Sequence, residues 1–173
     1  MPSALAIRRY RPADAGRVRE LNAAAMGATD AFADCVPDAD PDRISKEYVE
    51  TGGDFLVGEL AGRIVAMGAF RPTAGYITEF VDESADATAE IKRLRVAPAH
   101  QRRGYGEALC AALERRARRR GFVDVVLDTN PEQRGARRLY AERGFEEVGH
   151  EHVETENESF EAVVYRKSLA ESR

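Results

Sequence analysis

Hydrophobic residues along the chain follow two kinds of pattern, which together predict a mixed α/β fold. Short runs rich in Val, Ile, Leu and Phe are typical of strands, and hydrophobic positions three or four residues apart are typical of helices. The runs that predict strands are residues 5–8, 55–60, 64–70, 89–96, 123–130 and 160–167. The stretches that predict helices are residues 14–26, 44–49, 107–120 and 133–143. This order is typical of an α/β sheet whose strands run in mixed directions.

The segments that connect these predicted helices and strands are expected to be turns and loops. Gly62 lies in a tight turn between two of the strands, which predicts a hairpin. Residues 27–43 are rich in Gly, Ala, Asp and Pro and predict a loop, whereas residues 76–81 either prolong the second hairpin strand or form an irregular excursion. The acidic residues 151–158 are expected to be exposed. Since no repeat, low-complexity tract or linker divides the chain, we expect a single domain over residues 1–173.

The segment from Gln101 to Gly106, with the sequence Gln-Arg-Arg-Gly-Tyr-Gly, carries the strongest functional signal. It lies between the predicted strand 89–96 and the predicted helix 107–120. Glycines let the main chain approach an anion closely, and the free N–H groups of a new helix point toward it. The two arginines add charge-assisted hydrogen bonds to phosphate oxygens. The segment therefore predicts a turn that binds a pyrophosphate.

Two other phosphate-binding patterns fit this turn less well. The Rossmann fingerprint, G-x-G-x-x-G, requires a third glycine where this chain has Leu109. The P-loop sequence, G-x-x-x-x-G-K-[ST], is absent.

A second motif follows the first at a regular distance. The strand-like run 123–130 ends at Asn130-Pro131, and the next helix carries Leu139 and Tyr140 on one hydrophobic face before Gly144 ends it. With Val96-Ala97-Pro98 before the phosphate turn, the two motifs resemble those of the GNAT N-acetyltransferases, V-x-P then [RQ]-x-x-G-x-[GA], and Asn…Tyr…Gly-Phe. The resemblance covers about residues 5–170 and is strongest over residues 88–148.

The resemblance implies a GNAT fold, with a mixed sheet of about six to seven strands and about four helices. The two strands flanking the phosphate helix are expected to splay apart. Acetyl-CoA is the implied co-substrate: its pantetheine pairs with the main chain of Leu94 and Val96, and its pyrophosphate lies on the amides of residues 102–107. The residues expected to contact it are Leu94, Arg95, Val96, Gln101, Arg102, Arg103, Gly104, Tyr105, Gly106, Glu107 and Asn130. The Asn130 side chain is also suited to capping the following helix.

Two side chains are candidates for proton transfer. Tyr140 stands where members of the family often place a tyrosine near the thioester sulfur, and a phenol is able to protonate a departing thiolate. Its alternative role is a core residue with a satisfied hydroxyl. Glu90 lies eleven residues before Gln101, the spacing of the glutamate in several family members, and is the candidate base, acting directly or through water. Its alternative role is an ion pair with Lys92 or an arginine.

Composition places this chain among globular proteins. With 173 residues, of which 43% are hydrophobic, the chain is long enough to bury a core. No hydrophobic stretch approaches the length of a membrane span and no secretory signal is visible, so a cytoplasmic protein without membrane contact is expected. Cys35 and Cys110 are isolated, and the histidines form no zinc pattern, so no metal is expected. The pair His150-x-His152 is interpreted as exposed.

Charge is unevenly distributed. Residues 91–120 contain ten Lys/Arg and two Glu, a net +8, whereas the whole chain has a net charge of −4. This basic segment surrounds the phosphate turn and suits a cofactor with several phosphates. The arginines at positions 115, 116 and 118–120 are interpreted as an exposed helix end, where positive charge favours the helix dipole. Nucleic acid is not an expected partner, because the chain is acidic overall and lacks aromatic residues beside these arginines.

The acceptor is the least determined feature. The resemblance favours a small-molecule primary amine, such as an amino acid, and an enzyme of the bacterial type. A protein or peptide N-acetyltransferase is the enzymatic alternative, and a module that senses acyl-CoA without transfer is the non-enzymatic one. Acidic residues in segments 82–90 and 151–161 are candidates for attracting a cationic amine. A homodimer is expected by analogy with the family alone.

Overall fold

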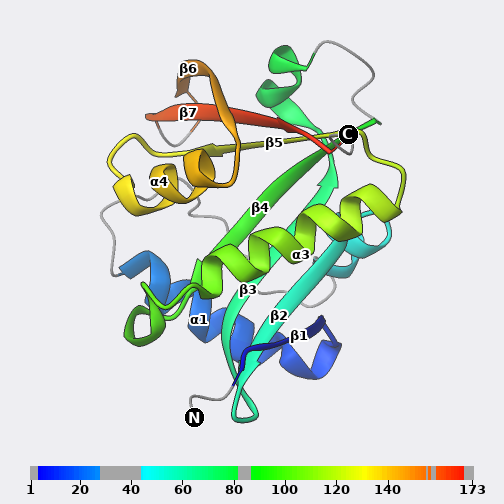
Figure 1. The fold of residues 1–173 in the computed structure, drawn as a ribbon, viewed down its shortest axis with the longest axis vertical. Helices are drawn as coiled ribbons and strands as arrows, with labels where there is room; N and C mark the ends of the chain where they lie inside the picture. The colour runs from blue at the N-terminus through cyan, green and yellow to red at the C-terminus, as the bar shows by residue number, and fades with distance from the viewer. Residues whose placement is uncertain (1–3, 28–43, 82–86, 155, 157–158, 170–173) are drawn as a thin grey trace.

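The structure is a computed structural model that describes residues 4–27, 44–81, 87–154, 156 and 159–169. Within these residues, seven strands form one mixed sheet in the order β1-β2-β3-β4-β5-β7-β6 (Figure 1). The strands are β1 (Ala6–Arg9), β2 (Asp54–Leu60), β3 (Arg63–Pro72), β4 (Thr88–Val96), β5 (Asp124–Thr129), β6 (Glu146–Glu154) and β7 (Ser159–Ser168). The α-helices are α1 (Ala15–Gly27), α3 (Tyr105–Arg119) and α4 (Arg134–Glu142). The short helical segments are η1 (Pro12–Asp14), η2 (Ser45–Val49), η3 (Gly75–Phe80) and η5 (Pro98–His100).

The sheet splits between its two central strands, as the resemblance implied. β4 and β5 are parallel and pair from Thr88 to Glu90, but β4 continues to Val96 with no partner strand on that side in the described part of the chain. Its other side stays paired with β3 to the end of the strand. Arg93 has a φ of +58° at a register shift between β3 and β4, which marks a bulge just beyond the split. A bulge bends a strand and increases its twist, so it helps β4 to diverge from β5.

Helices cover both faces of the sheet. α3 crosses β2, β3 and β4 on the near face of Figure 1, and α1 lies behind β3 and β4. The core under α3 and α4 includes Leu56, Phe70, Leu109, Leu113, Leu127, Tyr140 and Phe145. The core under α1 and η2 includes Val18, Leu21, Ile44, Tyr48, Phe55, Val57 and Met67. Alternate residues of β2 thus enter different cores, as strand geometry requires.

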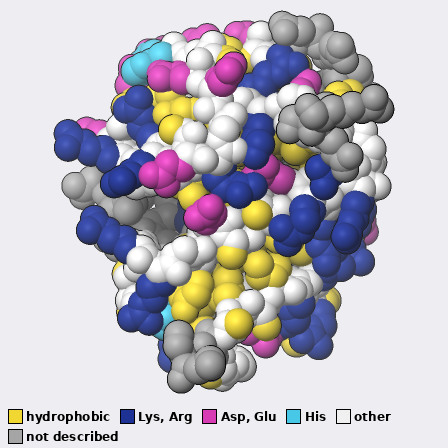
Figure 2. Space-filling view, in the orientation of Figure 1, with side chains coloured by type: hydrophobic (Ala, Val, Ile, Leu, Met, Phe, Trp, Pro, Cys, Tyr) yellow, Lys and Arg dark blue, Asp and Glu magenta, His cyan; other side chains and the backbone are white. Residues whose placement is uncertain are grey.

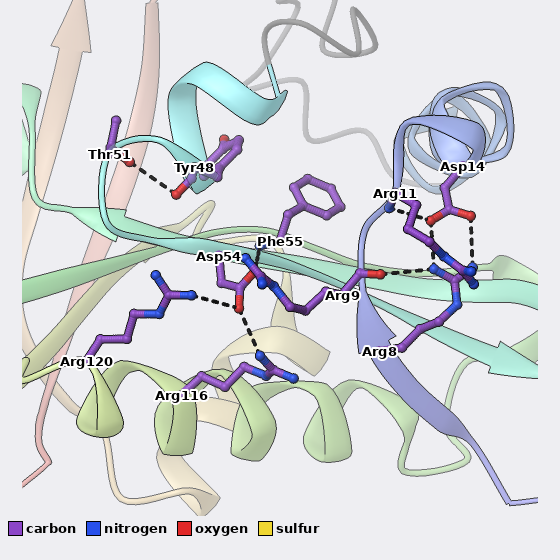
Figure 3. Close-up of polar contacts among 10 residues, drawn as sticks. All are labelled: Arg8, Arg9, Arg11, Asp14, Tyr48, Thr51, Asp54, Phe55, Arg116 and Arg120. Carbon is purple, nitrogen blue, oxygen red and sulfur yellow. Dashed lines mark hydrogen bonds and ion pairs between the residues drawn. The ribbon is translucent and has the colours of Figure 1, made fainter.

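A buried carboxylate ties α3 to the sheet. Asp54, at the start of β2, is 1% exposed and meets Arg116 and Arg120 of α3 at 3.0 and 3.6 Å, and Arg9 of β1 at 3.0 Å (Figure 3). It also accepts a hydrogen bond from the main-chain N–H of Phe55. Part of the arginine-rich helix end therefore has a structural role that the interpretation as an exposed helix end missed.

The remaining arginines at this end of α3 are exposed. Arg115, Arg118 and Arg119 point to solvent, and Figure 2 shows basic side chains gathered over this part of the molecule. For these three residues the interpretation as an exposed helix end is confirmed.

Two predicted segments differ from the sequence-based expectation. Residues 76–81 neither prolong β3 nor form an irregular excursion, because η3 is a 3₁₀ helix whose Ile77 packs against Val126 and Val164. β6 was not predicted, because none of its residues is buried and its sequence lacks a hydrophobic alternation. Its first residues follow Phe145, and its last reach into the acidic segment 151–158. The loop expected over residues 27–43 lies outside the described residues except at Gly27, where α1 ends.

Candidate active site

The predicted phosphate turn connects η5 to α3. Gly104 is the N-cap residue of α3 and has a φ of +84°, and Arg102 also lies in the left-handed region with a φ of +63°. No side chain caps this helix end, so the N–H groups of its first turn lack side-chain acceptors. A Cβ atom at Gly104 would have nothing within 4 Å, which shows that the space beside the turn is open. The turn therefore presents free donors to an open space.

A cavity of about 690 Å³ lies against this turn. It is bounded by the end of β4, the turn, the start of α3 and one side of α4. Of the predicted cofactor residues, those that line it are Leu94, Arg95, Val96, Gln101, Arg102, Gly104, Tyr105, Gly106 and Glu107. Arg103 is exposed and does not line this cavity. The Gln101 side chain instead donates to the Val96 carbonyl at 3.1 Å, which fixes the turn to the end of β4.

Asn130 lies in a neighbouring cavity. Its Oδ1 atom accepts a hydrogen bond from the main-chain N–H of Glu132 at 2.8 Å, so it stabilises the turn between β5 and α4. The expected capping of the following helix by this side chain is therefore wrong, because the N-cap residue of α4 is Gln133 and Asn130 lies in the turn before it.

This second cavity, of about 290 Å³, is bounded by β4 on one side and by the ends of β5 and β7 on the other. We call it the acceptor cavity. The two cavities meet at the split in the sheet, where they share a set of lining residues: Leu94, Arg95, Gln133, Ala136 and Tyr140. The two cavities therefore adjoin along these five residues.

Tyr140 stands where the two cavities meet. Its ring packs against Phe145 and Tyr165 with centroid distances of 5.7 and 5.8 Å, and the residue is 7% exposed. Burial raises the pKa of its phenol above the ordinary value, so the hydroxyl stays protonated at neutral pH. Among the described residues, none forms a hydrogen bond with this hydroxyl. Tyr140 is thus a core residue whose hydroxyl stays protonated where the two cavities adjoin.

Glu90 lies at the last point where β4 pairs with β5, and it is 4% exposed. The N–H of Ala74 donates to its Oε1 atom at 3.3 Å. Lys92 Nζ lies 3.8 Å from Oε2 and Arg71 Nε lies 4.0 Å from Oε1. Burial raises the pKa of Glu90, although Lys92 and Arg71 oppose the shift. The ion pairs anticipated as its alternative role are therefore present, in a carboxyl that also lines the acceptor cavity.

The structure adds residues that the sequence did not single out. Arg71 pairs with Glu90 in the β3–β4 register and lines the acceptor cavity, as does Asp128 of β5. No sequence motif marks Arg71, because its place depends on the pairing of two strands that are nineteen positions apart at this point.

Some of the acidic residues named as candidates for attracting an amine line the acceptor cavity and others do not. Glu90 and Glu161 line it, whereas Glu151, Glu154 and Glu156 do not, and four basic residues do: Arg71, Lys92, Arg93 and Arg95. Asp82, Glu83, Asp86 and Glu158, which were also candidates, lie outside the described residues, as does Cys35.

The two histidines of β6 contact a carboxylate on the neighbouring strand. His150 Nε2 and His152 Nδ1 each lie 2.7 Å from Glu161 of β7, and both side chains are about half exposed. No group of residues suited to holding a metal ion is found in the part of the chain that the structure describes. Nor does any helix of that part have the length and hydrophobicity to span a membrane.

Comparison with known proteins agrees with the fold and with the two motifs. The structure matches the yncA protein of Salmonella typhimurium, solved with its cofactor acetyl-CoA, with a TM-score of 0.79 and 22% identity over 98% of this chain and 96% of that one. It also matches the ribosomal-protein-alanine N-acetyltransferase of Brucella melitensis, with a TM-score of 0.77 and 20% identity over 95% and 99% of the chains. These likenesses establish the fold. The model of the acetyltransferase (GNAT) family matches residues 19–145, and the chain belongs to that family.

Curated relatives are similar over part of their length. N-acetyltransferase 8F1 of Rattus norvegicus is 32% identical over 106 residues, which are 61% of this chain and 45% of the relative. N-acetyltransferase 8 of Rattus norvegicus is 34% identical over 107 residues, 61% of this chain and 46% of the relative. The chain thus spans about half the length of the curated relatives it matches. These relatives are mammalian, so the expected bacterial type stays a prediction.

Proposed function

We propose that this protein transfers an acetyl group from acetyl-CoA directly to a primary amine of a small molecule. The observation that carries the proposal is the meeting of two cavities at the split between β4 and β5, with Tyr140 lining both. One cavity begins at the phosphate turn and suits the cofactor. The other contains a buried carboxyl and suits an amine.

The cofactor cavity fits acetyl-CoA on two grounds. The uncapped first turn of α3 offers N–H groups to a pyrophosphate, with the helix dipole behind them. The part of β4 beyond the split offers unpaired main-chain groups, to which the amides of pantetheine can add as a further strand would. The N–H of Ala97 donates to Val65 on β3, so strand alternation directs the N–H of Val96 away from β3 and toward the split.

The chemistry is a single displacement through a tetrahedral intermediate. The neutral amine nitrogen attacks the acetyl carbonyl carbon and forms the C–N bond of the intermediate, which then collapses as the carbon–sulfur bond breaks, leaving the amide and the CoA thiolate. In this proposal Glu90, directly or through water, takes the proton that the amine loses, and Tyr140 gives its proton to the departing thiolate. A raised pKa makes Glu90 a stronger base than an ordinary carboxylate, and the raised pKa of Tyr140 keeps that donor protonated.

Two variants separate binding from transfer in the proposed reaction. Gly104→Glu puts a side chain and a negative charge where the turn has a φ of +84° and open space, so calorimetric binding of acetyl-CoA should be lost. Tyr140→Phe should keep that binding and lower turnover of an amine substrate by roughly 10²-fold or more, the usual contribution of a general acid. Turnover is measured as release of free CoA across a panel of amines, amino acids and peptides.

Each variant has a matched control in the same chain. Gly62 has a φ of +82° and nothing within 4 Å of a Cβ, but it lies in the β2–β3 hairpin, so Gly62→Glu should still bind acetyl-CoA. Tyr165 is also buried beside Tyr140, so Tyr165→Phe should keep turnover. A folded wild type that does not bind acetyl-CoA would refute the proposal. Binding without transfer would favour the acyl-CoA sensor, and transfer to peptides alone would favour the peptide N-acetyltransferase.

A further inference from the structure

The acceptor cavity has a basic wall formed by neighbouring strands. Arg71 on β3 pairs with Glu90 on β4, and Lys92 follows two residues along, so the three side chains share one face of the sheet. All three line the cavity. A cavity that received only a cationic amine would not be expected to gather positive charge beside its single buried carboxylate.

Arg71 has a donor that the protein leaves unused. Its Nε atom is buried and has no hydrogen-bond partner among the residues that the structure describes, and the Arg71 side chain lies in the wall of the cavity. The guanidinium is held in place by the ring of Tyr48, whose centroid lies 5.8 Å away. A buried donor without an acceptor is unfavourable and is rare in native proteins. An acceptor oxygen of a bound molecule would satisfy it.

The neighbouring cations have other partners. Arg93 donates to the Tyr48 hydroxyl at 2.5 Å and lies 3.7 Å from Glu47 of η2. Arg95 donates to Asn22 of α1 at 3.4 Å. Arg71 and Lys92 instead share Glu90, at distances beyond a hydrogen bond. Asp128 and Glu161 also line the cavity, so its four basic and three acidic residues sum to +1, and Arg71 and Lys92 are the two cations beside the buried Glu90.

We infer that the acceptor carries a carboxylate beside its amine, as a free amino acid does, and that Arg71 and Lys92 bind this carboxylate. The inference rests on the proposed transfer to a small amine and names the acceptor's class. The guanidinium of Arg71 supplies paired donors suited to a carboxylate, and Lys92 adds a second charge. The amine then lies next to Glu90, the candidate base. A peptide N-terminus offers no carboxylate at this position.

The test compares each free amino acid with the amine that remains when its carboxylate is removed, as one pair of substrates. L-phenylalanine is paired with phenethylamine and L-methionine with 3-(methylthio)propylamine, and the panel contains the corresponding pairs for the other amino acids. The wild type is expected to show a kcat/KM at least about ten-fold higher for the amino acid of a preferred pair, as for a charged hydrogen bond. Arg71→Gln should abolish this preference by lowering the value for the amino acid while that for the amine changes little. Lys92→Met should lower it in the same direction.

Arg63→Gln is the matched control, because Arg63 is exposed at the first position of β3, next to the hairpin turn, and its variant should keep the preference. Calorimetric binding of the amino acid to the wild type and to Arg71→Gln, with CoA present, gives a readout independent of turnover. Equal rates for acid and amine in the wild type would overturn the inference, as would an equal loss for both in Arg71→Gln. Transfer to peptides alone, or to no acceptor despite acetyl-CoA binding, would overturn it too. Failure to bind acetyl-CoA would refute the proposed function itself.

Discussion

At the candidate active site, burial of an ionisable side chain opposes its ionised form and at the same time changes its pKa. Glu90 is nearly fully buried, and its two cationic neighbours do not offset the loss of solvent, since the net effect is a raised pKa. Its position and that of Tyr140 were predictable from the sequence, because each stands at a fixed distance from a recognisable turn. Arg71 was not, since its place depends on strand pairing.

The raised pKa of Glu90 predicts a trade between stability and activity. The folded state holds this proton to a higher pH than the unfolded state, so stability falls as pH rises from the ordinary value of 4.5 through the folded pKa. Glu90→Gln removes this penalty. We therefore expect the variant to be more stable than the wild type at pH 8 and to show a smaller gain in stability at pH 5. Its kcat should be lower than that of the wild type. Urea unfolding at both pH values and a pH–rate profile measure these effects.

Glu114 is the matched control for Glu90. It is also buried, and burial acts to raise its pKa, but hydrogen bonds from Arg143 and Lys167 lower it overall. Its contribution to stability is therefore present above the ordinary pKa and is lost as pH falls through the lowered one. Glu114→Gln should be destabilised at pH 8. If Glu90→Gln is equally destabilised, Glu90 acts as a structural ion-pair partner, and an unchanged rate would assign the base elsewhere.

Among the elements, those with a buried hydrophobic face were predictable and those without one were not. α3 was predicted from its regular hydrophobic spacing, and it begins two residues earlier than expected because the turn glycine itself is the N-cap. β6 was not predicted because hydrogen bonds to β7 stabilise it, whereas none of its side chains is buried. η3 was not predicted because it is short, and its contacts with β5 and β7, made by Ile77 and the partly buried Phe80, depend on the tertiary fold.

The attachment of α3 to β2 predicts a loss of stability without a loss of cofactor binding. Asp54→Ala removes the acceptor of Arg9, Arg116 and Arg120. Because those arginines are one third to one half exposed and can be solvated, we expect about 1–3 kcal/mol of destabilisation in urea unfolding. Acetyl-CoA affinity should be unchanged, since these contacts lie near the end of α3, about 20 Å along a 15-residue helix from the phosphate turn.

An exposed ion pair provides the comparison for Asp54. Glu20 pairs with Arg17 on α1 with 70% of its side chain exposed, so Glu20→Ala should change stability by less than about 1 kcal/mol. If Asp54→Ala costs no more than this control, the buried cluster does not fix α3.

For the whole molecule, the split of the sheet is the feature that the residues alone could not reveal. β4 is a continuous run that would pair along its full length in an ordinary sheet, and its divergence from β5 depends on contacts between distant segments. The split was predicted from the resemblance to the GNAT family, and the structure shows at which residue it begins. The uneven distribution of charge was visible in the sequence, but the roles of the basic residues were not. Some of these residues lie at the phosphate turn, some attach α3 to the sheet, and some line the acceptor cavity.

The split predicts where hydrogen exchange responds to each part of the cofactor. Acetyl-CoA should slow local exchange both in residues 101–107 and in residues 91–96, because pantetheine is expected to pair with the open edge of β4. Adenosine 3′,5′-bisphosphate, which lacks pantetheine, should slow exchange at the phosphate turn alone. The hairpin residues 58–64 serve as a segment that neither compound contacts, and Gly104→Glu should lose both responses. Equal protection of β4 by the two compounds, or none by acetyl-CoA, would show that pantetheine does not occupy the split.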